Sequence, residues 1–161
     1  MTQTLFEPIR SADFSPCGQY RYRLQRIWDR SRPIIAFMGL NPSTANAETD
    51  DPTIRRVIGF AKREGYGGVS MYNLFNVVSP DPKVLLTHPD PLGPDGWKWL
   101  AVVSLYPKVV LCWGAFPEAK ERAAEVLQVL TPGALYCLGK TAAGHPKHPL
   151  YLPSDSPLIK F

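Results

Sequence analysis

Two segments of this 161-residue chain carry side-chain amides directly after runs of apolar residues. Residues 39–44 form a predicted tight turn that presents the amide of Asn41 and two hydroxyl groups, and Asn73 ends a second apolar run. An amide at a strand end, with the ring of Phe75 two residues later, is suited to bind the edge and the face of a flat ring. A plain turn, a capping asparagine and a core phenylalanine are the structural alternatives.

A proline-rich loop near the C-terminus supplies side chains that could exchange protons. Residues 144–153 contain His145, Lys147 and His148. Because histidine titrates near neutral pH, such a loop is suited to contact a nucleobase or to act as an acid or base, whereas an ordinary surface loop is the alternative. No further His, Cys or carboxylate cluster is spaced to complete a metal site with these histidines. We therefore expect no metal and no cofactor.

An α/β layer fold is predicted to position these residues, because apolar runs alternate with helical patterns. Continuous apolar runs predict strands buried on both faces. These strands cover residues 34–39, 69–73, 108–113 and 134–138. Apolar residues at helical spacing predict helices over residues 52–64, 81–86, 94–105 and 117–130. In parallel sheets ligands bind beyond the carboxyl ends of the strands, which is where the amides and the histidine loop are expected.

The segment before the first buried strand alternates aromatic and basic residues. Residues 20–30 therefore predict a strand with one wet, basic face, carrying Arg21, Arg23 and Arg26. Such a face could follow a phosphate backbone. An ordinary solvated surface is the alternative, because the net charge is only +4.

Composition indicates one domain over residues 1–161, with 45% hydrophobic and 20% charged residues. The modest positive charge permits an acidic partner such as nucleic acid. Three cysteines without a CxxC pair indicate reduced thiols. The first eight residues lack the pattern of a secretion leader, and no apolar run is long enough for a bilayer. We expect a cytoplasmic monomer that does not bind membranes.

The order of these segments resembles the uracil-DNA glycosylase superfamily. Residues 39–43 are similar to the first catalytic motif of the mismatch-specific uracil/thymine glycosylases, and Asn73 matches the residue at the end of the second strand. The strand at residues 110–114 also matches, and residues 148–150 are similar to the second motif. The resemblance covers roughly residues 34–153.

A closer resemblance links the chain to a bacterial and phage family known only as a domain of unknown function. Residues 41–45 and 50–56 carry this resemblance. The superfamily fold implied for the chain is a three-layer α/β sandwich. Its centre is a mostly parallel four-stranded sheet, to which the N-terminal segment adds a strand or hairpin.

The resemblance implies base excision from DNA, in which a flipped base is cut from its sugar. It gives Asn41 the role of orienting the attacking water through its side-chain carbonyl, and His148 that of donating a hydrogen bond to the departing base. Asp50 is a candidate to assist the water. The residues implied in base binding are Gly39, Leu40, Pro42, Ser43, Tyr72, Asn73 and Phe75. Within this set Tyr72 or Phe75 would stack on the base, and the small Ser43 predicts a pocket that accepts more bases than uracil.

The implied partner is DNA, in duplex form with a damaged or mismatched base. The residues expected to contact it are Thr44, Arg55, Arg56, Trp113, Gly114, Lys147, Pro149, Leu150 and Tyr151. Of these, the last three would press into the gap that the flipped base leaves. The predicted function is a monofunctional DNA glycosylase acting on uracil, a deaminated base or a modified base. The alternatives are a non-catalytic nucleic-acid or nucleotide-binding module on the same fold, and an N-glycosidase of free nucleosides or nucleotides.

Overall fold

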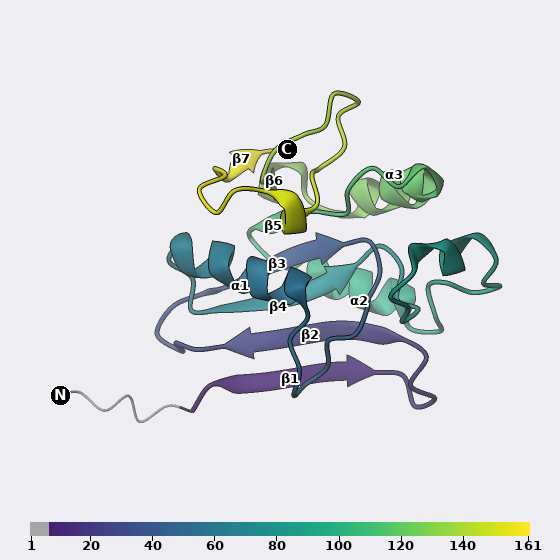
Figure 1. The fold of residues 1–161 in the computed structure, drawn as a ribbon, viewed down its shortest axis with the longest axis horizontal. Coiled ribbons are helices and arrows are strands. Elements are labelled where there is room, and N and C mark those ends of the chain that lie inside the picture. Colours follow the sequence, from purple (N-terminus) through teal and green to yellow (C-terminus); the bar gives the residue numbers. More distant parts are fainter. Residues whose placement is uncertain (1–6) are drawn as a thin grey trace.

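The computed structural model describes residues 7–161 and shows a mixed α/β fold built on one seven-stranded sheet (Figure 1). Residues 1–6, on which part of the expectation about a secretion leader depends, lie outside the described residues. The strand order across the sheet is β1-β2-β4-β3-β5-β6-β7. The strands are β1 (Ile9–Phe14), β2 (Arg21–Ile27), β3 (Ile34–Gly39), β4 (Gly68–Asn73), β5 (Val109–Leu111), β6 (Leu135–Cys137) and β7 (Ile159–Lys160).

Half of the six strand pairings are parallel. The neighbours β4, β3, β5 and β6 run parallel to one another, whereas β1, β2 and β7 join by antiparallel pairing. The sheet is therefore larger and more mixed than the prediction of a mostly parallel four-stranded sheet with an added N-terminal strand or hairpin. The additional strands come from an N-terminal hairpin, β1–β2, and from the last residues of the chain, which the sequence patterns left without a strand.

Helices cover the sheet on both sides. Among the described residues the α-helices are α1 (Pro52–Arg63), α2 (Gly96–Val103) and α3 (Lys120–Val129). Residues of α1 pack with Phe37 and Met71 on one face, and residues of α2 and α3 pack with Met38 and Tyr72 on the other. Because the central strands are covered twice, both faces of each are apolar, which explains their unbroken hydrophobic runs.

Short 3₁₀ turns connect the main elements. They are η1 (Pro82–Leu86), η2 (Pro117–Ala119), η3 (Pro132–Ala134) and η4 (Pro149–Tyr151). Each begins at a proline, whose fixed φ suits the first turn of a helix. Figure 1 shows η4, in yellow, lying next to α1.

The start of α1 follows the predicted capping pattern. Asp51 is the N-cap, and its carboxylate accepts a hydrogen bond of 2.8 Å from the backbone N–H of Ile54. Pro52 occupies the first helical position. Side-chain caps of this kind satisfy one of the unpaired N–H groups at the start of a helix. The cap fixes the place where α1 begins, at the edge of the site described next.

Candidate functional site

A cavity of about 430 Å³ opens at the carboxyl ends of β3 and β4, between the start of α1 and the turn η4. Nine of the predicted site residues line it, the two predicted catalytic residues among them. These are Gly39, Leu40, Asn41, Ser43, Thr44, Asn73, His148, Leu150 and Tyr151. A volume of this size lies within the range of small-molecule sites. The parallel strands thus bring together segments more than one hundred residues apart.

The amide of Asn41 is held in one orientation by backbone carbonyls. Its Nδ2 donates to the carbonyls of Pro42 and Ser79 at 3.1 Å each, and to that of Val77 at 3.4 Å. Only the NH₂ group of an amide can donate to carbonyls, so these contacts assign the positions of Nδ2 and Oδ1 in the Asn41 side chain. The side-chain carbonyl therefore remains available on a residue that lines the cavity.

Asn73 lies deep in the same cavity. Its side chain is buried, and its Nδ2 has no hydrogen-bond partner among the described residues. A buried polar group without a partner costs roughly 1–3 kcal/mol, so an occupant that accepts from this amide would be favoured. A Cβ at residue 39 would lie 2.9 Å from Asn73 Oδ1 and 2.7 Å from Met71 Cε. Gly39 is thus the residue that lets these side chains enter the cavity.

The loop that carries His148 is anchored to the ends of two central strands. The backbone N–H of Gly114, after β5, donates to the carbonyl of Pro146, and the N–H of Lys147 donates to that of Gly139, after β6, both at 2.9 Å. Gly114 has a φ of +78°, which disfavours other residues there. These bonds fix the loop, and with it His148, against the sheet.

His148 lines the cavity with Nε2 as its free hydrogen-bond donor. Its Nδ1 accepts from the backbone N–H of Leu150 at 3.2 Å, so the neutral ring carries its proton on Nε2. Burial lowers the pKa of His148 below its ordinary value, against the opposing pull of the Asp51 charge. The ring is therefore neutral near pH 7.

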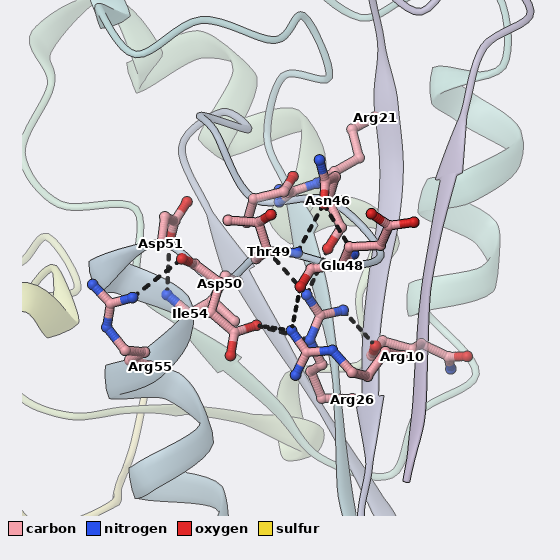
Figure 2. Close-up of polar contacts among 12 residues, drawn as sticks. Arg10, Arg21, Arg26, Asn46, Glu48, Thr49, Asp50, Asp51, Ile54 and Arg55 are labelled. Atoms are coloured by element: carbon pink, nitrogen blue, oxygen red, sulfur yellow. Dashed lines mark hydrogen bonds and ion pairs between the residues drawn. The ribbon is translucent and has the colours of Figure 1, made fainter.

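The loop between β3 and α1 is fastened to the N-terminal hairpin by arginines, as Figure 2 shows. Arg26 of β2 donates through Nε to the Asp50 carboxylate at 2.9 Å and through its other nitrogens to the backbone carbonyls of Gln25, Asn46 and Thr49. Arg10 of β1 reaches the same Asp50 oxygen at 3.1 Å. Asp50 therefore fixes the loop and does not line the cavity. The predicted role of assisting the water has no support in this position, because the carboxylate faces the hairpin.

Arg21 lines the cavity, although it was expected on a wet strand face. In the β1–β2 ladder, Asp13 pairs with Arg23 and Phe14 pairs with Arg21, so Tyr22 is an extra, bulged residue. β-bulges re-aim the side chains beside them. Arg21 is consequently only 2% exposed, next to Asn73 and the α1 start. The alternation of aromatic and basic residues in the sequence does not reveal this bulge.

Tyr72 and Phe75 lie elsewhere than expected, in the core on the α2 side of the sheet. The Tyr72 hydroxyl bonds that of Tyr106 at 2.9 Å. Successive side chains of a strand point to opposite faces, so Tyr72 cannot share the cavity with Asn73. The expectation that either ring stacks on a bound base is wrong for this arrangement.

Two of the arginines expected to bind DNA have partners within the protein. Arg56 donates to the carbonyls of Pro149 and Leu152, and so fastens η4 to α1. The exposed Arg55 donates to the carbonyl of Asp50 at 3.1 Å. Neither arginine lines the cavity itself, and Arg56 holds the turn η4 that does.

The remaining predicted contacts divide between the core and the surface. Trp113 is buried, and its ring contacts that of Phe161 edge-on. Pro42 and Pro149 are also buried. None of these three residues lines the cavity. Tyr151, by contrast, is 86% exposed at the cavity rim. An exposed aromatic ring beside a cavity is available to contact a partner.

Cys112 lines the cavity but is not a reactive thiol. Burial raises the pKa of Cys112 to about 12, so the thiolate that attacks electrophiles is absent at neutral pH. In the described part of the chain, His, Cys, Asp and Glu side chains nowhere form the group of three that a metal ion needs. Among residues 7–161, no helix combines the length and apolar character required to cross a bilayer.

The protein thus has a mixed α/β fold with a cavity at the carboxyl edge of its parallel strands. The chain belongs to the family described as "Protein of unknown function (DUF1643)", whose model matches residues 21–150. No curated protein and no solved structure matches the chain. The matched region includes β2 and ends within η4, so it spans the Arg21 bulge and the His148 loop.

Proposed function

We propose that this protein is a DNA glycosylase of the uracil-DNA glycosylase superfamily. It hydrolyses the N-glycosidic bond of a flipped uracil, deaminated base or modified base in DNA. The observation that carries the proposal is the convergence of Asn41, Asn73 and His148 on one cavity. A three-layer arrangement with parallel central strands, and the order of these three residues along it, support membership of that superfamily.

The water-positioning step falls to Asn41. Its Nδ2 is bound by three carbonyls, so the Oδ1 atom is free to accept a hydrogen bond from a water aimed at the sugar C1′. A neutral amide orients the water without removing its proton. The oxygen of that water forms the new bond to C1′, and the proton it loses balances, through solvent, the proton taken up by the departed base anion.

The leaving base is stabilised by His148 and held by Asn73. As the glycosidic bond breaks, its electron pair moves onto the base, and negative charge grows on a ring carbonyl oxygen. A neutral imidazole that donates from Nε2 stabilises this charge without first losing its own proton. Asn73 binds the polar edge of the same ring.

A competing function is the hydrolysis or binding of a free nucleotide. The intramolecular bonds of Arg55 and Arg56 favour it, because they reduce the cationic surface left for a DNA backbone. Salt separates the two functions. Duplex binding weakens steeply as salt rises, by a factor set by the number of phosphates contacted, whereas binding of a free nucleotide weakens far less.

The test is single-turnover excision at protein excess on labelled oligonucleotides that carry uracil, hypoxanthine, xanthine or a G·T mismatch. We expect base release by the wild-type protein and a loss of about 100-fold or more in Asn41→Ala and His148→Ala. His145→Ala is the matched control, because His145 shares the loop but does not line the cavity. Base release that survives in both site variants would refute the assignment.

A further inference from the structure

The N-terminal hairpin brings Arg21 to the cavity wall without a direct ion pair to a carboxylate. Arg21 Nη1 donates to the carbonyl of Ala45 at 3.0 Å, and Nε is buried without a hydrogen bond. Among the described residues Arg21 forms no ion pair. Burial lowers the pKa of Arg21 to about 10, which still leaves it charged at neutral pH. A buried charge of this kind is stable only if further acceptors reach it.

Two residues that carry an unpaired buried donor line this cavity. Arg21 Nε and Asn73 Nδ2 are the buried side-chain nitrogens without a partner among residues 7–161, and both residues line it. His148 adds a third donor, because its Nδ1 is already bound as an acceptor. Three donors predict an occupant rich in acceptors.

The charge of Asp51 decides between two acceptor-rich occupants. Its carboxylate lies at the cavity wall and interacts electrostatically with Arg21. A phosphate would be repelled by this carboxylate, whereas an uncharged ring with carbonyl oxygens would not. The cavity therefore favours a nucleobase carbonyl against Arg21.

We propose that Arg21 is a specificity-determining residue that selects a 6-oxopurine over a 6-aminopurine. The proposal rests on the proposed function and names the substrate class of the same cavity. A guanidinium donates in parallel to O6 and N7 of a 6-oxopurine, as it does in DNA recognition. Adenine has an amino group where hypoxanthine has a carbonyl oxygen. In a complex with adenine, this amino group and the Arg21 guanidinium would both be donors, so no hydrogen bond could form between them. The hairpin thus distinguishes a deaminated purine from its parent base.

The proposal is tested by the affinities of the wild-type protein for free hypoxanthine and free adenine, measured by calorimetric titration. We expect hypoxanthine to bind at least about tenfold more tightly, and Arg21→Gln to reduce the ratio to within about threefold. Arg21→Lys keeps a charged donor without the planar fork and should retain only part of the preference. The matched control is Arg23→Gln, because Arg23 lies on the other face of the same strand, over Trp99 and paired with Asp13. The control should keep the wild-type ratio.

Three results would overturn the inference: equal affinity for the two bases in the wild-type protein, binding of neither base, or a preference that survives in Arg21→Gln. Displacement of hypoxanthine by inorganic phosphate would also overturn it, since the cavity would then be an anion site. The wild-type ratio tests the proposal even if a variant fails to fold. Free bases contain no glycosidic bond, so a tenfold preference without excision activity would uphold this inference while refuting the proposed function.

Discussion

Replacing Arg26 by methionine should destabilise the protein strongly, because this buried side chain fastens the loop that forms the cavity wall. Arg26 is 3% exposed and donates to one carboxylate and three backbone carbonyls. Asp50 keeps Arg10 as a partner, so the expected cost is that of losing the hydrogen bonds of a charged group, about 1.5–3 kcal/mol. At roughly 2–4 °C per kcal/mol for a chain of this size, the melting temperature should fall by about 3–12 °C.

Arg10→Met is the matched control, because Arg10 contacts the same Asp50 oxygen from a side chain that is 41% exposed. An exposed ion pair contributes only about 0–1 kcal/mol. Urea unfolding followed by tryptophan fluorescence measures both changes, with an unchanged denaturant slope indicating that stability alone has changed. Equal losses in the two variants, or a loss below about 1 kcal/mol for Arg26→Met, would refute the reasoning.

Three further predictions concern the cavity and the thiols. Gly39→Ala should displace the Asn73 side chain, weaken base binding by about tenfold or more and destabilise the fold by about 1–3 kcal/mol. Calorimetric titration measures the affinity, and urea unfolding measures the stability. An unchanged affinity for the base would contradict the predicted contact between residue 39 and Asn73. Burial holds the pKa of His148 below its ordinary value, so this side chain binds a proton more readily in the unfolded chain than in the folded protein. The free energy of unfolding should therefore fall as the pH drops below about 6.5. In His148→Gln, the urea midpoint should depend less on pH between pH 5 and 8. The exposed Cys17 should react at once with a thiol reagent and the buried Cys112 only after unfolding; a fast phase that persists in Cys17→Ser would disagree.

The central elements could be predicted because their signals are local. The apolar run at residues 34–39 coincides with β3, and the Asp51–Pro52 pair marks the start of α1. The amides and His148 could also be placed together, because strand ends in a parallel arrangement meet at one edge. These inferences needed only the apolar pattern and the residues that follow it.

Other features depend on long-range geometry that no local pattern contains. The bulge at Tyr22 sends Arg21 into the cavity, and it arises from pairing with β1. The positions of Asp50 and Arg56 depend on partners in distant segments. Tyr72, in contrast, could have been excluded from the site, since it directly precedes Asn73 on one strand and must face the other way.

The measurement that tests the central claim most directly is mass-spectrometric detection of the free base and the abasic product after incubation with hypoxanthine- or uracil-containing DNA at protein excess. We predict equal amounts of both products from the wild-type protein. Asn41→Ala should release base about 100-fold more slowly while its affinity for the free base changes little, because Asn41 orients the water. Intact DNA after prolonged incubation with folded, base-binding protein would contradict the account.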